Sequence, residues 1–479
     1  MQKFLSKMIF VIIVGLFLSI NLTAQSNNKK VAKALNKILD DDYFESTTIA
    51  VDIFDLTSNK SLYKKNSKKL LHPASNMKLI TTIAALEYLG PKYEFKTSLY
   101  HTGIIMDSIC YGDVFVQGGF DPDFTTIDLD TLVQEIRKFG VNEIRGNLYG
   151  DVSKMDSLHW GKGWMWDDDP STDFPYMTSL IINDAAIKIV YQPGLIGKKI
   201  NYELIPQTNF FNITNTSYTS KEDTSNFDIS RNWLNHGNEI SITGDISFKE
   251  EQDTVELNII NPEYYFMYLF KEKLKEKSIN FLGIIDTLTL PEFPKHIYTH
   301  SRQFKNIINN INKESDNLSA EMTLLALASE HFDEKSTAKN GVKIIDSLIV
   351  KVGLEANDYK IVDGSGASHY NLVSTELMVK LLEYMYQSSK QNYKILFNSL
   401  PIAGVDGTLE KRMRRSKAHR NVRAKTGTLS GVSTLSGYLL SKNKHRIAFS
   451  IFVQNFVGSS RVARRYQDKI CKFLAGAKL

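Results

Sequence analysis

Short runs rich in apolar and β-branched residues, and segments in which apolar and polar residues alternate, predict strands in three parts of this chain. Near the beginning it covers residues 48–56 and 62–65, and near the end it covers residues 433–440 and 446–456. Between these regions, short alternating segments separated by Gly, Asn and Asp recur across residues 111–246. The pattern therefore predicts a sheet built from both ends of the chain and a β-rich middle.

Apolar residues spaced three and four positions apart mark the predicted helices. These lie at residues 75–89, 319–329, 342–350, 377–386 and 462–474. Most of them follow the β-rich middle, so strands and helices mix at the two ends of the chain. We therefore predict an α/β domain interrupted by an insertion.

The domain boundaries are predicted where the two patterns change. We expect residues 28–96 and 297–479 to form one split domain, and residues 97–296 to form a β-rich insertion in two parts. Within the insertion, residues 209–226 are rich in Thr, Asn and Ser, which is typical of an exposed loop. The length of 479 residues, with 42% hydrophobic and 23% charged residues, fits a globular chain of more than one domain.

Residues 1–24 have the pattern of a cleavable secretory signal peptide, which predicts a periplasmic location. Two lysines precede an apolar stretch at residues 8–20, and the small residue Ala24 follows. An uncleaved signal anchor is the alternative. The apolar stretch is short for a membrane span, and Gln25 rather than Cys follows, so we expect no span after cleavage and no lipid anchor.

Charge and cysteine content exclude several classes of protein. Removing two lysines with the signal peptide lowers the net charge from +5 to +3, which is too mild to indicate a nucleic-acid partner. Two cysteines rule out a disulfide-rich framework, and two separate buried thiols are favoured over a Cys110–Cys471 pair. The ten histidines show no metal-ligand spacing and no nucleotide-binding string occurs, so we predict no metal and no cofactor.

Ser75 and Lys78 form the first candidate catalytic string. S-x-x-K occurs elsewhere in the chain, but only at Ser75 does a proline precede it and a helical pattern follow it. Residues three apart share a helix face, so Lys78 could accept the proton of Ser75 if its amine is neutral. Lowering a lysine pKa from about 10.4 to between 7 and 8 corresponds to about 4 kcal/mol. Lys425 is the candidate second cation that would help to lower it.

The string Ser315-Asp316-Asn317 is expected to complete the proton transfers. Ser315 could relay a proton between Lys78 and the leaving nitrogen, while the amide of Asn317 could bind the substrate backbone and orient Lys78. His72 offers a Ser–His alternative for activating the serine. It is less favoured because no third orienting group is evident and Lys78 already fills the role.

The string Lys425-Thr426-Gly427, followed by Thr428, is expected to bind substrate at a sheet edge. Lys425 and the hydroxyls of Thr426 and Thr428 suit an anionic group such as a terminal carboxylate. Gly427 is expected to let the substrate lie against the strand. The backbone N–H groups of Ser75 and Thr428 would form an oxyanion hole.

These strings, in this order, resemble the D-alanyl-D-alanine carboxypeptidase/endopeptidase family, the class C low-molecular-mass penicillin-binding proteins. The segments at residues 363–368, 112–122 and 146–151 extend the resemblance over almost the whole mature chain. It implies a β-lactamase/transpeptidase-like catalytic domain, with an antiparallel sheet flanked by helices and a large insertion between the first and second strings. It also implies a serine peptidase that acts on peptidoglycan stem peptides and is inhibited covalently by β-lactams.

The resemblance also suggests how the insertion contacts substrate. Residues 163–168 are similar to a segment whose final acidic residue faces the amino end of the substrate's diamino acid, which makes Asp168 a substrate-binding candidate. A solvated acidic turn before Pro170 is an equally favoured interpretation. His369, Ser430 and Phe120 depart from residues common in the family, which leaves the contacts to the substrate side chain open.

Two other functions stay open from the sequence. A β-lactamase is one, but the 237 residues between Lys78 and Ser315 exceed what a compact β-lactamase needs. The other is a non-catalytic wall-binding protein that keeps the fold. The balance between carboxypeptidase and endopeptidase activity and the oligomeric state are not determined by the sequence.

Overall fold

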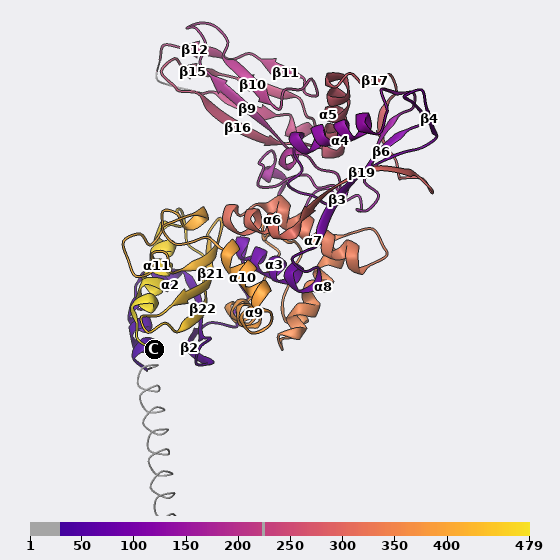
Figure 1. Ribbon diagram of the computed structural model, residues 1–479. Coiled ribbons are helices and arrows are strands. Elements are labelled where there is room, and N and C mark those ends of the chain that lie inside the picture. Colours follow the sequence, from indigo (N-terminus) through magenta and orange to yellow (C-terminus); the bar gives the residue numbers. More distant parts are fainter. Residues whose placement is uncertain (1–28, 223–225) are drawn as a thin grey trace, which may run out of the picture.

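The computed structural model describes residues 29–222 and 226–479. The predicted signal peptide, residues 1–24, lies outside the described residues. Figure 1 shows two bodies joined by a pair of long strands. One body combines the two ends of the described chain, and the other contains its middle.

A five-stranded antiparallel sheet in the order β2-β1-β22-β21-β20 forms the centre of the first body. Its strands are β1 (Thr48–Asp55), β2 (Lys60–Lys65), β20 (Arg423–Leu429), β21 (Val432–Leu440) and β22 (Arg446–Gln454). β1 pairs with β22, so the two ends of the chain share one sheet, as the alternating pattern predicts. β20 lies at an edge, which leaves one side of its backbone available.

Helices cover both faces of this sheet. On one face, α11 (Arg461–Gly476) packs against β21, together with the helical residues 29–39. The other face carries a cluster formed by α3 (Met77–Tyr88), α7 (Asn317–His331), α8 (Ala338–Lys351), α9 (Thr375–Gln387) and α10 (Lys390–Ser399). Ten of the 12 residues of α3 are buried, because neighbouring helices surround it. The short helices α2 (Tyr43–Ser46) and α6 (Phe304–Asn309) complete this body.

The part of the insertion next to this body contains two sheets and two helices. One sheet has the order β18-β8-β6-β3-β19 and the other β17-β7-β5-β4. The strands are β3 (Glu94–His101), β4 (Ile104–Met106), β5 (Ile109–Tyr111), β6 (Val114–Gln117), β7 (Glu143–Ile144), β8 (Leu148–Asp151), β17 (Asn280–Phe281), β18 (Ile285–Thr287) and β19 (Lys295–Gln303). The helices α4 (Thr126–Lys138) and α5 (Pro262–Glu276) pack in the same core.

The outer part of the insertion consists of small sheets (Figure 1). Their strands are β9 (Ala186–Gln192), β10 (Asn201–Ile205), β11 (Ile213–Asn215), β12 (Tyr218–Ser220), β13 (Asp228–Arg231), β14 (Ile240–Thr243), β15 (Asp245–Ser247) and β16 (Asp253–Asn258). The prediction of one exposed loop at residues 209–226 was wrong, because β11 and β12 form there. Their partners β14 and β15 come later in the chain, so local composition could not show the pairing.

The sequence-based boundaries of the insertion fall inside the joining strands. Residues 96 and 97 lie within β3, and residues 296 and 297 within β19. The two strands pair from Glu94 with Gln303 to His101 with Lys295. The helices α4 and α5 were not foreseen in a β-rich segment, although α4 buries Leu129, Leu132, Val133 and Ile136 at helical spacing.

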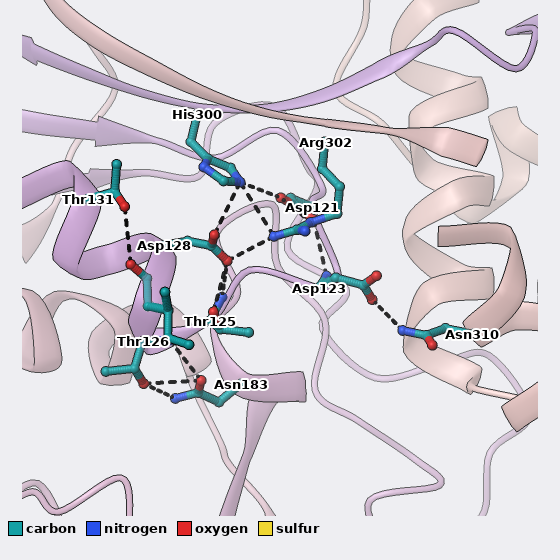
Figure 2. A network of polar contacts seen from close by, with 11 residues as sticks. Asp121, Asp123, Thr125, Thr126, Asp128, Thr131, Asn183, His300, Arg302 and Asn310 are labelled. Carbon is teal, nitrogen blue, oxygen red and sulfur yellow. Dashed lines mark hydrogen bonds and ion pairs between the residues drawn. The ribbon is translucent and has the colours of Figure 1, made fainter. Parts of the chain in front are cut away.

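A polar network fastens the insertion to the first body at these strands (Figure 2). Arg302 of β19 donates to Asp121 (Nε to Oδ1, 3.1 Å) and to Asp128 of α4 (Nη2 to Oδ2, 2.8 Å). Asp123 accepts a hydrogen bond from Asn310 Nδ2 at 2.9 Å. Asn310 begins a π-helix that ends immediately before Ser315, so the network ties the insertion to the second candidate string.

Both cysteines are buried and unpaired, as favoured from the sequence: Cys110 lies in β5 and Cys471 in α11. Within residues 29–222 and 226–479, the helices fall short of the length and apolar character that a bilayer crossing requires.

Candidate active site

The three sequence strings meet at one cleft of about 490 Å³. Ser75 comes from the turn before α3, and Ser315 lies between the π-helix Asn310–Glu314 and α7, which begins at Asn317. Thr426, Gly427 and Thr428 come from the edge strand β20. Residues separated by more than 200 positions thus line the same space. The cleft lies where the helical cluster meets the edge of the sheet.

Ser75 lies in a tight turn and not in the first turn of an α-helix. The turn Ala74–Asn76 is a 3₁₀-helix that leads directly into α3. Ala74 has a φ of +47°, a conformation that costs free energy for a residue with a Cβ atom and is typical of functional sites. Asn76 ties the turn to the sheet, because its Nδ2 donates to Lys425 O at 3.1 Å and to Thr434 Oγ1 at 2.8 Å.

Lys78 is fully buried beside Ser75, and only uncharged groups accept its hydrogen bonds. Its Nζ donates to Ser75 Oγ at 3.1 Å, to Ser365 O at 2.9 Å and to Asn317 Oδ1. Burial lowers the pKa of Lys78 to about 8, and Asp316 is the strongest of the carboxylates that oppose this shift. The geometry is therefore that of a nucleophile next to an amine that can be neutral near physiological pH.

Two buried carboxylates hold the loop that presents the Ser365 carbonyl to Lys78. Glu321 of α7 accepts hydrogen bonds from the backbone N–H groups of Gly364 and Ser365. Asp363 accepts from the backbone N–H groups of Gly366 and Ser368, at 2.9 and 2.6 Å. Burial raises the pKa of Glu321 to about 7, with the charge of Asp363 adding to the rise.

Glu321 was not predicted as a site residue. It lies inside a helical pattern where a glutamate usually faces solvent, and nothing local indicated burial. The loop at residues 363–368 resembles a segment of the family. Its carboxylate partner, however, comes from a helix more than 40 residues earlier.

Lys425 is the second buried amine of the site. Its Nζ donates to Ser315 Oγ at 2.7 Å and to Thr426 O at 3.1 Å. Burial first, and then the charge of Lys78, lowers the pKa of Lys425. Burial lowers the pKa of Lys78, and the Ser315 hydroxyl that is expected to relay a proton accepts a hydrogen bond from Lys425.

Gly427 is required by the protein's own packing. A Cβ atom at this position would lie 2.2 Å from Thr434 Oγ1 and 2.9 Å from both Pro73 O and Ser75 N. This packing is a second reason for the glycine, beside the expected one that a side chain would block the substrate. A side chain there would push the Ser75 turn away from β20, and the glycine lets the two elements approach.

The insertion forms one wall of the cleft. Asp173 and Phe174 are among the residues that line it, and Asp173 O accepts a hydrogen bond from Asn317 Nδ2. Trp164 Nε1 donates to Asp363 Oδ2 at 3.2 Å, which links the insertion to the loop beside Lys78. Because Asn317 Nδ2 already donates one hydrogen bond to Asp173 O, its second N–H is left for the expected contact with substrate.

Asp168 is not among the residues that line the cleft. Its Oδ2 accepts from Met165 N at 2.7 Å, so it caps its own 3₁₀ turn. Burial raises its pKa, with the nearby His369 opposing the rise. The His369 ring in turn contacts the His72 ring at 5.7 Å between centroids. Asp168 is thus half-buried in a turn and faces the loop that follows Ser368.

Three more polar residues line the cleft near β20 and were missed by the sequence analysis: Thr408, Arg412 and Arg464. Thr426 Oγ1 donates to Thr408 Oγ1 at 2.7 Å, and Arg464 Nη2 donates to Thr428 Oγ1 at 3.1 Å. In the sequence, the basic side chains between positions 462 and 474 have the spacing of a solvent-exposed helix face. Only the packing of α11 against β21 brings Arg464 to the cleft, where it reaches Thr428 of β20.

Sequence comparisons identify similar proteins. The model of the D-Ala-D-Ala carboxypeptidase 3 (S13) family matches residues 31–477. The chain is 26% identical over 419 residues to the D-alanyl-D-alanine carboxypeptidase DacB of Haemophilus influenzae, covering 86% of each protein. It is 28% identical over 457 residues to a D-alanyl-D-alanine carboxypeptidase of Actinomadura, covering 92% of this chain and 84% of that protein.

Solved structures show the same fold. The crystal structure of penicillin-binding protein 4 from Haemophilus influenzae has a TM-score of 0.82 at 23% identity, covering 90% of this chain and 97% of that chain. Its complex with a β-lactam has a TM-score of 0.75 at 22% identity, with the same coverage. The predicted fold class, a penicillin-binding catalytic domain with a large insertion, is confirmed.

Proposed function

The chain belongs to the D-Ala-D-Ala carboxypeptidase 3 (S13) family, and we propose that it hydrolyses peptidoglycan stem peptides or cross-links through an acyl-enzyme on Ser75. The observation that carries this proposal is the environment of Lys78. A fully buried amine whose pKa is lowered to about 8 lies 3.1 Å from the serine hydroxyl. A serine needs such a base to become a nucleophile.

The acylation step follows from these contacts. Lys78 takes the proton of Ser75 while Oγ bonds to the carbonyl carbon of the penultimate D-alanine. The C–N bond to the last residue then breaks, and the proton that Lys78 took passes through the Ser315 hydroxyl to the leaving nitrogen, which returns Lys78 to its neutral form. Lys425 holds the Ser315 hydroxyl in place by a hydrogen bond. Water releases the acyl group by the reverse transfers and regenerates the Ser75 hydroxyl.

The remaining site residues would hold the substrate. Asn317 orients Lys78 through Oδ1 and offers an N–H to the substrate backbone. The edge strand β20 offers backbone groups to an extended peptide, with the N–H groups of Ser75 and Thr428 as the oxyanion hole. Asp168, on the insertion, would attract the free amine of a diamino acid in the stem peptide.

Two further expectations belong to this proposal. We propose that β-lactams acylate Ser75 as substrate mimics, which fits the β-lactam complex of penicillin-binding protein 4. We also propose a periplasmic location after cleavage of residues 1–24, on the pattern of that segment alone. The same nucleophile suits two kinds of substrate. One is a stem peptide with a terminal D-alanine, and the other is a cross-link in which a diamino acid takes the place of that D-alanine.

The decisive experiment compares the mature wild-type protein with Ser75→Ala and, as a matched control, with Ser459→Ala at an exposed position. Each protein is incubated with a fluorescent penicillin and, separately, with purified cross-linked and uncross-linked muropeptides. We expect lasting label and peptide cleavage in the wild type and in Ser459→Ala, and neither in Ser75→Ala. The ratio of the two muropeptide rates assigns the carboxypeptidase and endopeptidase shares.

Two outcomes would contradict the proposal. Steady hydrolysis of penicillin without lasting label would indicate a β-lactamase. Absence of label in wild-type protein that melts cooperatively would indicate a non-catalytic wall-binding protein.

A further inference from the structure

Residues 169–174, here called the wall segment, are the part of the insertion that reaches the active site. Asp173 and Phe174 line the cleft, and Asp173 O accepts a hydrogen bond from Asn317 Nδ2. The other end of the same amide, Oδ1, accepts a hydrogen bond from Lys78 Nζ. Because one end of an amide only donates and the other only accepts, a fixed carbonyl beside Nδ2 keeps Oδ1 turned toward Lys78.

The wall segment is fastened on its other side by Asn258, a buried residue at the end of β16. The side-chain Nδ2 donates to Ser171 O at 3.1 Å and to Phe174 O at 2.9 Å. The backbone N–H of Asn258 donates to Pro170 O at 3.1 Å. One residue of the outer insertion therefore holds three carbonyl groups of the wall segment.

Arg231 of β13 completes this clamp from a second sheet. Its fully buried side chain donates from Nη2 to Asn258 Oδ1 at 2.7 Å and to Asp169 Oδ1, and from Nη1 to Gly237 O at 2.8 Å. Asp169 is the first residue of the wall segment, and its Oδ2 accepts from Tyr176 OH at 3.1 Å. A buried ion pair with these further hydrogen bonds keeps its geometry, because separating its charges away from water is costly.

An unbroken series of contacts thus leads from the outer sheets to the base. Arg231 and Asn258 hold the wall segment, the wall segment holds Asn317, and Asn317 holds Lys78. None of the residues that line the cleft comes from the described outer sheets, residues 186–222 and 226–258. A reacting group that moves by about 1 Å can lose a factor of about 100 in rate, so support from a distance can matter for the chemistry.

We propose that Arg231 and Asn258 are positioning residues for acylation: through the wall segment they fix the orientation of the Asn317 amide and, with it, the hydrogen bond to Lys78. The inference rests on the proposed function and assigns part of its chemistry to the outer sheets of the insertion. Neither residue touches the substrate or the reacting atoms. The outer sheets therefore control the acylation rate even for a ligand too small to reach them.

The test measures the second-order rate constant with which a fluorescent penicillin acylates Ser75. Asn258→Ala and Arg231→Met are each introduced into the mature wild type and into Asn317→Ala. In the wild-type background we expect each substitution to lower the rate constant by about 10- to 100-fold. In Asn317→Ala the amide that the clamp positions is gone, so the same substitutions should change the remaining rate by less than about twofold.

Two controls separate positioning from general damage to the insertion. Ile229→Ala removes a buried side chain from β13, the strand of Arg231, and should lower the melting temperature but leave acylation at the wild-type rate. Lys198→Met, at an exposed position between β9 and β10, should change neither quantity. If Arg231→Met does not fold, Asn258→Ala decides the outcome, because it keeps the Arg231–Asp169 pair.

Three results would overturn the inference. These are no loss of rate in Asn258→Ala, a loss of the same size with and without Asn317, and a loss in Ile229→Ala as large as that in Asn258→Ala. A folded wild type that takes up no label would instead overturn the proposed function, so the two failures are distinct.

Discussion

The active site and the junction between the two bodies both bury charged side chains, but they surround them differently. At the junction, the buried carboxylate of Asp121 lies 3.1 Å from the Arg302 guanidinium. At the active site, Lys78 and Lys425 are fully buried, and their hydrogen bonds go to hydroxyl, amide and carbonyl oxygens. Neither lysine forms an ion pair within the described part of the chain.

This difference separates a positioning role from a chemical one. A buried charge with a counterion keeps its charge and fixes the geometry of its neighbours. A buried amine without a counterion gives up its proton more readily, since desolvation penalises the charged form. The junction therefore suits an anchor for the insertion and for the Ser315 segment, whereas the site suits proton transfer.

The largest expected effect comes from removing the unpaired amine itself. Lys78→Met keeps the length of the side chain but removes the base, so we expect acylation by a fluorescent penicillin to slow by about 10²- to 10⁴-fold. Thermal stability should not fall greatly, because a buried charge is replaced by an apolar group. Lys442→Met, at an exposed position, is the matched control. Labelling of Lys78→Met at the wild-type rate would show that another group is the base.

Breaking the paired charge at the junction should instead cost stability. Arg302→Met leaves Asp121 without its cation, and we expect a loss of about 2 to 3 kcal/mol in the free energy of unfolding. This is below the usual range for buried pairs, because the Arg302 side chain is 22% exposed. Urea unfolding measures it, and the exposed pair Arg145–Glu143 provides the control Arg145→Met, with less than about 1 kcal/mol expected.

The junction effect should depend on pH. Burial raises the pKa of Asp121 to about 6, with Arg302 opposing the rise. A carboxyl whose pKa is raised on folding contributes stability at low pH that is lost as the pH rises through the folded value. Without Arg302 the pKa rises further, so the loss in Arg302→Met should be larger at pH 8 than at pH 5. Asp121→Asn removes the unpaired charge, so adding it to Arg302→Met should recover part of the lost stability. The same loss at both pH values, or no recovery in the double variant, would contradict this account.

The pH dependence of the wild-type enzyme tests the unpaired amine. Because the pKa of Lys78 is lowered to about 8, its neutral fraction falls about tenfold per pH unit below that value. We expect the acylation rate constant to rise with this slope from pH 6 and to level off above pH 8. The measurement is a stopped-flow series with a fluorescent penicillin. A rate that does not change between pH 6 and 9 would show that Lys78 is not the titrating base.

The smallest expected effect concerns Asp168, a carboxylate whose proposed cation comes from the substrate. Asp168→Asn keeps the size of the side chain and removes the charge, and we expect KM to rise about two- to fivefold for stem peptides with a free amine at position three. Peptides in which this amine is acetylated should show no change. Equal effects on both peptides would favour the alternative interpretation, in which Asp168 only caps its own turn.

The sequence was sufficient for the parts of the site that depend on short-range spacing. A spacing of three positions from Ser75 to Lys78 places both side chains on one side of a turn, and the structure has Ser75 Oγ and Lys78 Nζ 3.1 Å apart. The strands at both ends of the chain were likewise predicted nearly to their bounds, because their apolar runs are long. The helices of the insertion were not predicted, because their helical spacing lies among segments in which alternation dominates.

Other features depend on which surfaces pack together, and no local pattern encodes that. Gly427 is needed because the Ser75 turn presses against β20, and Glu321 matters because α7 faces the loop at Ser365. Arg464 belongs to the cleft because α11 packs beside the sheet edge. The sequence by itself determined the chemical groups of the site and their order along the chain. The tertiary structure decided which charges are buried, paired or open to substrate, because burial and pairing arise only when distant segments meet.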